Sequence, residues 1–282
     1  MNELTLLAPA KINLCLHVLG KRSDGYHDLA MLMAPLDFGD QVNVRLTESR
    51  EITLECPGVE LPSGDENIAV KAARAVLSCC DYAGGVHITI DKQIPVAAGL
   101  GGGSSDAAAV MRALNELLGL ELTGDRLREL GVTLGADVPF FVAAEVAWAT
   151  GVGERLERVQ NLPSAWYLLV NPGFAVSTAW AFGNLGLTTP GTTTKMPRFS
   201  GQIEEIVALL HNDLEEVTAT RYPDIVELKA ELLEHGALGT LMSGSGPTVF
   251  GVFSNEASAR KASRELTQRP GQRAIVTSVL GN

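Results

Sequence analysis

The sequence predicts a protein of the α+β class, and three features of its strand and helix pattern support that prediction. The segment INLCLHV, residues 12–18, alternates apolar and polar side chains with the period of a half-buried strand. The segment VHITI, residues 86–90, alternates in the same way and runs into a glycine-rich turn that opens a helix. From Asp125 onward the spacing is again helical. Strands and helices that do not alternate regularly favour an α+β fold over a doubly wound sheet.

The glycine-rich turn, PVAAGLGGGSSDAAA at residues 95–109, has the composition of a phosphate-binding loop. Its glycines let a ligand approach the backbone and can adopt positive φ, and they are Gly99, Gly101, Gly102 and Gly103. Ser104, Ser105 or Asp106 can cap the helix that follows, whose free N–H groups and dipole attract anions. The structural alternative is a tight, well-capped turn, for which one or two glycines suffice. Four glycines and two serines therefore favour phosphate binding.

Neither of the two common phosphate loops matches this turn. A Walker A loop requires G-x-x-x-x-G-K followed by Ser or Thr, and the chain contains no such string. A dinucleotide loop requires G-x-G-x-x-G, but counting from Gly99 places Ser104 where the third glycine belongs. The turn is therefore predicted to bind phosphate but to belong to neither of these two classes of loop.

The composition limits the function classes. The chain has 282 residues, of which 46% are hydrophobic and 20% charged, as expected for a soluble globular protein with a real core. Its formal net charge of −11 argues against nonspecific binding of nucleic acid or of an anionic membrane. The cysteines form no C-x-x-C pair, and the start of the chain has no signal pattern, so a cytoplasmic protein with reduced thiols is expected.

In the first half of the chain, residues 4–18 predict one or two strands, broken at Ala8-Pro9-Ala10. Lys11 follows the break and, taken alone, is an ordinary edge charge. Turn-forming residues then precede an adjacent Tyr26 and His27, a pair that alone is more often loop packing than a ligand contact. Residues 41–55 predict a hairpin, and residues 67–80 an amphipathic helix.

The second half continues with a helix predicted over residues 125–134. Asp137 lies between Gly135 and Pro139, where an acid is usually a cap or turn residue. The composition shifts near residues 155–165, which predicts a domain boundary there. Strands are expected over residues 145–150, 166–173 and 273–280, and helices over 202–217, 223–235 and 255–268. Residues 183–201 are expected to form a long surface loop. A second glycine-rich stretch, MSGSGPTVFGVF, is expected to enter a strand.

Three separated stretches together resemble the motifs of one family. They are PAKINLCLHV at residues 9–18, PVAAGLGGGSSDAA at 95–108 and SGSGPTVFGVF at 243–253. In this order they resemble the GHMP kinases, the superfamily of galactokinase, homoserine kinase and mevalonate kinase. The loop departs from that family's P-x-x-x-G-L-G-S-S-A-A pattern by Gly102 and Gly103. With RSDGYHDL and TLGADVPFF, this extended loop is similar to the branch that acts on 4-diphosphocytidyl-2-C-methyl-D-erythritol.

The resemblance, which covers nearly the whole chain and is weakest at 183–201, implies a two-domain GHMP kinase fold. Residues 1–158 would form an ATP-binding N-terminal domain of ribosomal-S5-like type, and residues 159–282 a C-terminal α/β domain. The implied reaction is ATP-dependent phosphorylation of the 2-hydroxyl of the small-molecule substrate, diphosphocytidyl-methylerythritol, in non-mevalonate isoprenoid precursor biosynthesis. No Cys/His cluster has the spacing of a transition-metal site, so Mg²⁺ arriving with ATP is the expected metal, with Ser105 as a candidate ligand.

The resemblance also implies roles for individual residues. Lys11 and Asp137 match the catalytic pair. The residues that match the substrate side are Asn13, Tyr26, His27, Thr178 and Phe182, with Tyr26 and Phe182 stacking on cytosine and His27 bonding its polar edge. The residues that match the ATP side are Asn67, Lys92, Pro95, Gly99, Leu100, Gly101, Gly102, Gly103, Ser104 and Ser105. Base stacking is worth about 1–3 kcal/mol per base, which gives the two aromatic rings a physical reason.

Two other functions compete with this expectation. A different GHMP small-molecule kinase, acting on homoserine or mevalonate, has no need of Tyr26, His27 and Phe182 together. A non-catalytic GHMP-fold regulator that binds nucleotide has no need to retain both Lys11 and Asp137.

Overall fold

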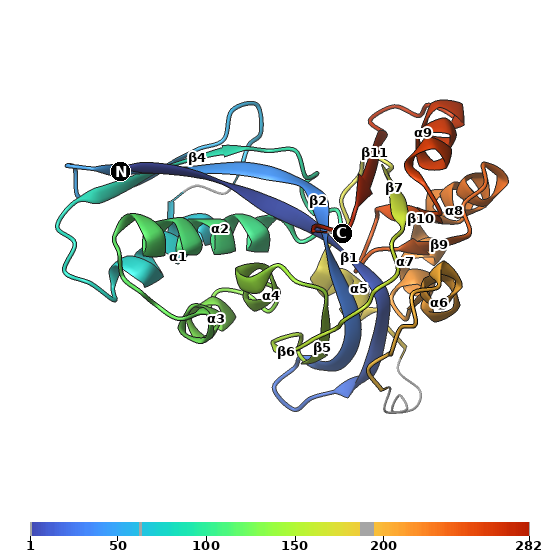
Figure 1. Cartoon of the computed structure of the whole chain (residues 1–282), viewed down its shortest axis with the longest axis horizontal. Coiled ribbons are helices and arrows are strands. Elements are labelled where there is room, and N and C mark those ends of the chain that lie inside the picture. The colour runs from blue at the N-terminus through green and yellow to red at the C-terminus, as the bar shows by residue number, and fades with distance from the viewer. Residues whose placement is uncertain (1, 62–63, 187–194, 282) are drawn as a thin grey trace. The chain divides into compact units, whose positions relative to one another are not determined.

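The computed structural model describes residues 2–61, 64–186 and 195–281, and its chain divides into two compact units. Unit 1 comprises Met1–Ala10, Gly39–Ile94 and Gly101–Ala144, and unit 2 comprises Lys11–Phe38, Pro95–Leu100 and Glu145–Asn282. The long β1 and β2, drawn in blue in Figure 1, contribute residues to both units. The domain boundary expected between residues 158 and 159 stays a prediction. Among the described residues, no helix combines the length and apolar character needed to cross a bilayer.

The elements of the described part mix both kinds of secondary structure. The strands are β1 (Glu3–Lys21), β2 (His27–Thr47), β3 (Ile52–Glu55), β4 (Gly85–Asp91), β5 (Ala147–Gly151), β6 (Arg155–Arg158), β7 (Trp166–Asn171), β8 (His211–Asn212), β9 (Gly239–Met242), β10 (Val249–Phe253) and β11 (Arg273–Ser278). The helices are α1 (Ile68–Leu77), α2 (Gly102–Leu117), α3 (Gly124–Val132), α4 (Val138–Ala143), α5 (Thr178–Gly183), α6 (Ile203–Leu209), α7 (Glu215–Arg221), α8 (Asp224–Glu234) and α9 (Glu256–Glu265), besides a 3-10 turn at Gly64–Glu66.

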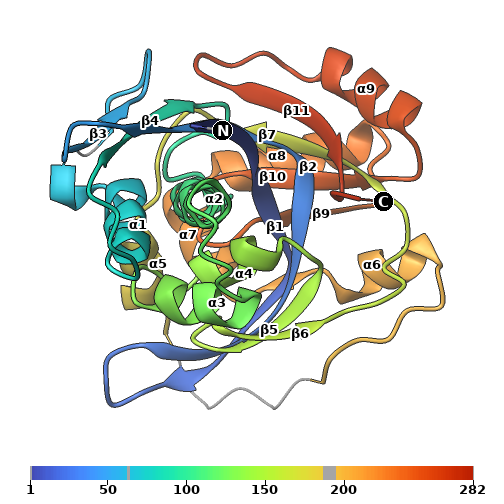
Figure 2. The same ribbon diagram turned by 60° about the vertical axis from the view of Figure 1, so that its left-hand side comes forward.

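Unit 1 packs helices against a small sheet. The end of β2 pairs antiparallel with β4, and β3 pairs parallel with β4 on the other side. Helices α1 and α2 pack against each other, and Figure 2 shows α2 almost end-on beside α1. The buried alanines of both helices, among them Ala72, Ala73, Ala108 and Ala109, allow that close approach.

Unit 2 contains an antiparallel four-stranded sheet in the order β11-β7-β10-β9. Helices α8 and α9 cover this sheet, α8 against β9 and β10 and α9 against β7 and β11 (Figure 1). In the same unit, the first part of β2 pairs antiparallel with β5, β5 pairs with β6, and the second half of β1 pairs parallel with β8. This last pairing joins residues 15–16 to residues 211–212, which are distant in the sequence, and it is short because β8 has only two residues.

The break expected at Ala8-Pro9-Ala10 was wrong, because β1 runs on without interruption through Pro9. Gly39 of β2 explains how the neighbouring strand tolerates this segment. A Cβ at Gly39 would lie 2.2 Å from the Ala8 carbonyl oxygen and 2.7 Å from the Pro9 Cα. Only glycine therefore lets the two backbones pass so closely here.

The hairpin expected over residues 41–55 was also wrong. The strand β3 does not turn back on β2 but pairs parallel with β4, after the chain has crossed over through α1. Parallel neighbours need such a helical crossover, whereas a hairpin needs only a short turn. Alternating side chains indicate a strand but do not indicate its neighbour. The fold class is nevertheless the α+β class that the sequence predicted.

Candidate active site

Parts of the three sequence motifs, residues 11–18, 95–100 and 243–253, meet in unit 2. The Lys11 backbone N–H donates to the Leu100 carbonyl oxygen at 3.0 Å, which joins the first motif to the glycine-rich loop. The Thr248 N–H donates to the Ala98 carbonyl at 3.3 Å, and the Ser243 hydroxyl donates to the Gly99 carbonyl at 3.0 Å. The loop is therefore fixed from both sides by the other two motifs.

Two glycines make this convergence possible. Gly99 has φ of +78°, and a Cβ there would lie 2.1 Å from the Ser243 carbonyl oxygen. Gly244 has φ of +57°, and a Cβ there would lie 3.3 Å from Nζ of Lys11 and 3.4 Å from Oδ1 of Asn13. Glycine is the residue that adopts positive φ without strain, so larger residues would distort both loops. The side-chain amide of Asn212 fixes the glycine-rich loop of the third motif, because it donates to the carbonyl oxygens of Met242 at 2.7 Å and of Gly244 at 2.8 Å.

Lys11 and Asn13 lie on the same face of β1, because strand side chains alternate with a period of two. The Lys11 ammonium donates to Oδ1 of Asn13 at 2.5 Å, and both side chains are buried. Burial of an ammonium is tolerated only where its charge is matched by polar partners. The first motif thus places a held cation beside the glycine loops.

The residues expected to bind the nucleobase are brought together in part. The rings of His27 and Phe182 stack at a centroid distance of 5.0 Å and an interplanar angle of 23°. Phe182 and Thr178 lie four residues apart on α5, on one face of the helix. The Thr178 hydroxyl is 3.0 Å from the Ser245 hydroxyl, which connects this group to the third motif. Tyr26 is 62% exposed, so its ring is available to a ligand.

The pKa of His27 is lowered by its partial burial and, secondarily, by the nearby charge of Lys21. Its ring is therefore neutral at pH 7, with one nitrogen that donates and one that accepts a hydrogen bond. A neutral imidazole of this kind suits the polar edge of a base.

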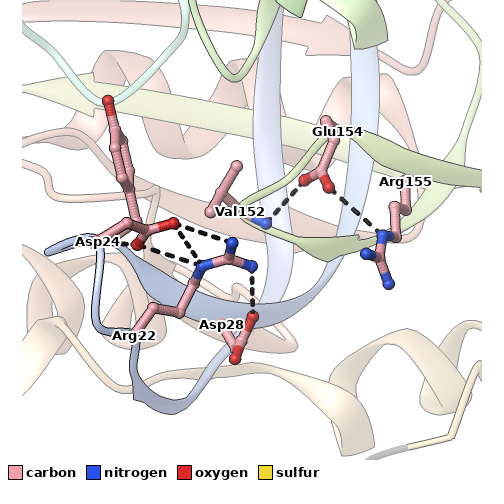
Figure 3. Close-up of polar contacts among 7 residues, drawn as sticks. Arg22, Asp24, Asp28, Val152, Glu154 and Arg155 are labelled. Atoms are coloured by element: carbon pink, nitrogen blue, oxygen red, sulfur yellow. Dashed lines mark hydrogen bonds and ion pairs between the residues drawn. The ribbon is translucent and has the colours of Figure 1, made fainter.

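A cluster of charges holds the turn that carries Tyr26 (Figure 3). The Arg22 guanidinium donates to Asp24 at 2.9 Å and to Asp28 at 3.2 Å, and all three side chains are at least 37% exposed. The bonds from Arg22, and then the backbone N–H of Tyr26, lower the pKa of Asp24. The Arg22 backbone N–H also donates to the Tyr26 carbonyl at 2.8 Å. Arg22 therefore holds the turn from its first residue, a role that no local pattern in the sequence indicates.

In unit 1, the second half of the glycine-rich loop opens α2. The N-cap is Gly101, with φ of +74°, so the helix begins before the serines. The expectation that Ser104, Ser105 or Asp106 caps the helix was therefore wrong, because all three lie inside it. The hydroxyl oxygen of Ser105 is buried and finds no hydrogen-bond partner within the described part of the chain. The first turn of α2 thus offers free N–H groups together with an unused buried hydroxyl.

Behind this turn lies a buried charge cluster that the sequence did not indicate. The Lys92 ammonium is 2.5 Å from Oδ2 of Asp40 and 2.6 Å from Oδ2 of Asp106, with side chains 5%, 0% and 4% exposed. Oδ1 of Asp40 accepts the backbone N–H groups of Gln93 at 2.6 Å and Ile94 at 2.7 Å. Oδ1 of Asp106 has no hydrogen-bond partner among the described residues.

The pKa values in this cluster follow from burial and charge. Burial alone would lower the pKa of Lys92, but the two carboxylates outweigh that effect and raise it. Burial and the neighbouring Asp40 raise the pKa of Asp106 to about 7, against the opposing effect of Lys92. One ammonium cannot neutralise two buried carboxylates, so Asp106 retains a proton more readily than an ordinary aspartate. Lys92, expected on the ATP side, is engaged by these partners.

Asp137 and Asn67 begin two other helices of unit 1. Asp137 occupies the N-cap position of α4, but its half-buried side chain makes no capping hydrogen bond in the described structure. Asn67 caps α1 by accepting the Ala69 N–H at 2.8 Å. A Cβ at Gly135 would lie 3.8 Å from the Ser104 hydroxyl oxygen, so the turn before Asp137 is close to α2. Lys11 and Asp137 belong to different units, and their joint action stays a prediction.

Comparison with known proteins agrees with these motifs. The model of the GHMP kinases N terminal domain matches residues 67–145, and that of the GHMP kinases C terminal domain matches residues 198–272. A 4-diphosphocytidyl-2-C-methyl-D-erythritol kinase of Syntrophotalea carbinolica is 54% identical over 271 residues, which are 96% of this chain and 97% of that protein. The Geobacter sulfurreducens protein of the same name is 51% identical over 279 residues, 99% of this chain and 100% of its own.

Solved structures agree as well. A crystal structure of a 4-(cytidine 5'-diphospho)-2C-methyl-D-erythritol kinase superposes with a TM-score of 0.82 at 36% identity, covering 99% of this chain and 100% of that one. A homoserine kinase from Cytophaga hutchinsonii has the same fold, with a TM-score of 0.72 at 18% identity over 99% of this chain and 95% of its own. The expected two-part α+β architecture is confirmed by these likenesses, and the chain belongs to the GHMP kinase family.

Proposed function

We propose that this kinase transfers the γ-phosphoryl group of ATP to the 2-hydroxyl of 4-diphosphocytidyl-2-C-methyl-D-erythritol, a step in non-mevalonate isoprenoid precursor biosynthesis. The observation that carries the proposal is the convergence of three motifs near Lys11. Leu100 and Gly244 contact the first motif, and Gly99 contacts the third. The names of the curated relatives, which match this chain over nearly its whole length, support the same substrate.

The nucleobase end of the substrate fits the residues around α5. Cytosine is a flat ring with a polar edge, and a base of that kind is held by stacking on aromatic side chains. Phe182 and the exposed Tyr26 supply rings, and the neutral His27 supplies a donor and an acceptor. A kinase for homoserine or mevalonate, neither of which carries a base, needs none of these. This group of side chains therefore favours the diphosphocytidyl substrate over those alternatives.

The glycine-rich loop suits the triphosphate of ATP. The residues we assign to the nucleotide are Asn67, Lys92, Pro95, Gly99, Leu100, Gly101, Gly102, Gly103, Ser104 and Ser105. The N–H groups at the start of a sixteen-residue helix form an anion site, which an acidic protein needs to hold a polyphosphate. The buried, unpartnered Ser105 hydroxyl fits Mg²⁺, which prefers oxygen ligands and arrives with ATP. When bound, the ion offsets the charge of the phosphate oxygens.

Lys11 and Asp137 are the residues we assign to the transfer itself. Asp137 leaves its carboxylate unused in capping, so it can accept the proton of the 2-hydroxyl or orient that hydroxyl. The Lys11 ammonium, held by Asn13, can offset negative charge as the phosphoryl group moves. Phosphoryl transfer depends mainly on alignment and charge stabilisation, so two such residues suffice.

The substrate assignment is tested by transfer from ATP to the diphosphocytidyl substrate, followed by phosphorus NMR of the product, with homoserine and mevalonate as competing acceptors. Turnover of homoserine or mevalonate instead would overturn the substrate assignment. ATP binding without transfer to any acceptor would favour a regulator.

The role of Asp137 is tested by Asp137→Asn. This change should slow single-turnover transfer by about 10²- to 10⁴-fold, the usual contribution of positioned acid–base catalysis, while ATP affinity changes little. Asp125→Asn, at a side chain 85% exposed, is the matched control.

A further inference from the structure

A second group of polar side chains lies in unit 2, where β1 pairs with β8. The register pairs Cys15 with His211 and Leu16 with Asn212, so His17 comes next to Asp213. Because side chains alternate along a strand, His211 and Asp213 point to one face, and the parallel register places His17 on that same face. Two strands about 190 residues apart in the sequence therefore present two imidazoles and a carboxylate together.

The contacts of these side chains are close. The imidazole rings of His17 and His211 stack at a centroid distance of 4.6 Å, and Nε2 of His211 is 2.6 Å from Oδ1 of Asp213. The other oxygen of Asp213 accepts the Val18 backbone N–H at 2.6 Å, and the Asp213 N–H donates to the Leu16 carbonyl at 3.0 Å. Asp213 is therefore anchored to β1, and one potential ligand atom from each of His17, His211 and Asp213 lies within 4.8 Å of the others.

We propose that His17, His211 and Asp213 form a binding site for one divalent transition-metal ion of the zinc class. Two imidazole nitrogens and one carboxylate oxygen are a ligand set that such ions prefer, and a three-residue set leaves a position open to water. Zinc bonds of about 2.1 Å in a tetrahedral arrangement separate ligand atoms by about 3.4 Å. Atoms that now lie up to 4.8 Å apart therefore have to approach by up to about 1.4 Å, and the 2.6 Å contact between His211 and Asp213 has to widen by about 0.8 Å. The side chain of His211 is 50% exposed, so its ring can turn from its stack on His17 to make that adjustment.

The donor atoms of this group are nitrogen and oxygen only. The two imidazoles supply nitrogen lone pairs and Asp213 supplies a carboxylate oxygen. Cys15, which pairs with His211 in the strand register, is buried, and its sulfur is not among the ligand atoms that lie within 4.8 Å of one another in the described structure.

This ion would cross-link β1 and the chain at β8. His17 lies six residues from Lys11 along the same strand, about 20 Å at the usual rise per residue, so the ion is not placed at the phosphoryl-transfer residues. The short β8 is joined to β1 by only two paired residues, so an added bond between the strands would stabilise the fold. No local pattern in the sequence indicates this site, because its ligands come from two distant segments.

The experiment is a Zn²⁺ and Co²⁺ titration of the full-length, metal-free protein without nucleotide, followed by calorimetry and by visible absorption. One ion should bind per chain, the Co²⁺ spectrum should lack thiolate charge-transfer bands, and Zn²⁺ should raise the unfolding temperature. His17→Gln and Asp213→Asn should each weaken binding by at least about tenfold. His235→Gln is the matched control, since His235 contacts Glu265 and lies outside the group.

Asp213→Asn keeps an acceptor for the Val18 N–H, so it tests the ligand role even if a histidine variant folds poorly. Far-ultraviolet circular dichroism of each variant establishes that it is folded. Wild-type protein that binds no Zn²⁺, or binding that survives both His17→Gln and Asp213→Asn unchanged, would overturn the proposal. Binding lost equally in His235→Gln would do so too.

Discussion

Two clusters in this molecule have the same composition, one basic side chain and two aspartates, but opposite surroundings. In unit 1, Lys92 is held between Asp40 and Asp106, and none of the three side chains is more than 5% exposed. In unit 2, Arg22 is held between Asp24 and Asp28, with side chains 37% to 50% exposed. The same charges should therefore contribute differently to the protein in the two places.

The difference lies in what water can do for an unpaired charge. In the buried cluster, an aspartate that loses its partner cannot be solvated, so every member depends on the others. In the exposed cluster, water and salt screen each charge, and the pairs contribute little to the free energy of unfolding. The exposed pairs still fix the conformation of the turn that carries Tyr26, because Arg22 bonds to Asp24 and Asp28 within and after that turn. We infer that the buried cluster stabilises the fold and that, if the proposed function holds, the exposed cluster positions Tyr26 for its ligand.

The largest effect is expected for Lys92→Met. This change leaves Asp40 and Asp106 buried without their cation, and breaking a buried pair in this way costs about 3–5 kcal/mol of unfolding free energy. Urea unfolding measures the loss. Lys71→Met, at an exposed position of α1, is the matched control and should change the unfolding free energy little. A loss below about 1 kcal/mol would mean that the buried cluster contributes no more to the free energy of unfolding than an exposed ion pair does.

The next effect is a loss of stability with rising pH, which the buried cluster should show. The pKa of Asp106 is raised to about 7 in the folded protein, mainly by burial, whereas its ordinary value is 3.8. The folded protein thus retains a proton that the unfolded chain has lost. The stability from this group is full below about pH 4 and is lost as the pH rises through about 7.

The unfolding free energy of the wild type, relative to Asp106→Asn, should therefore fall as the pH rises from 4 to 8. A fall of more than about 1.4 kcal/mol, the equivalent of one pKa unit, is expected. Asp91→Asn, at an exposed position, supplies the baseline for ordinary carboxylates. A difference that is flat or rises with pH would mean that Lys92 keeps Asp106 ionised.

A smaller effect is expected where the glycine-rich loop packs on the buried cluster. A Cβ at Gly102 would lie 3.0 Å from Nζ of Lys92 and 3.1 Å from Cγ2 of Ile94, while a Cβ at Gly103 would meet only Ile68 Cγ2 at 3.7 Å. Lys92 cannot give way without leaving its aspartates, so Gly102→Ala should destabilise the fold by about 1–3 kcal/mol. Gly103→Ala should be neutral or stabilising, by up to about 1 kcal/mol. Thermal unfolding of the two variants makes the comparison, and equal effects would contradict it.

The sequence predicted those features that depend on local pattern. The strand before the glycine-rich loop, the helix after it and the motif around Lys11 are visible because alternation, glycine content and spacing are properties of neighbouring residues. The α+β class followed from the order of these elements. The N-cap at Gly101 was missed because glycine at positive φ replaces the side-chain cap that a serine would supply.

The features that depend on register were beyond the sequence. Nothing local distinguishes Asp40, at the middle of a long strand, from a surface aspartate, yet it holds Lys92 from 52 residues away. The parallel pairing of β3 with β4 and the meeting of His17 with His211 have the same cause. Contacts of this kind are set by strand crossovers and register, which leave no periodic signal in the chain.

The smallest effect on stability, and the sharpest on function, is expected for Arg22→Ala. Both aspartates of the exposed cluster remain solvated when Arg22 is lost, so the unfolding midpoint should barely move. The turn that presents Tyr26 would lose the two bonds that lock it. If the proposed function holds, KM for the diphosphocytidyl acceptor should rise about tenfold, as expected when one stacking contact is weakened. The kcat and KM for ATP should stay unchanged, because the side chain of Arg22 is engaged with Asp24 and Asp28 and not with a residue assigned to ATP. Arg22→Lys should recover only part of the loss, since an ammonium cannot bridge Asp24 and Asp28 with a fork of fixed geometry.

Arg155→Ala is the matched control, because Arg155 pairs with Glu154 in the same region at 74% exposure (Figure 3). A raised KM in both arginine variants would point to general loss of positive charge, and an unchanged KM in Arg22→Ala would remove the positioning role.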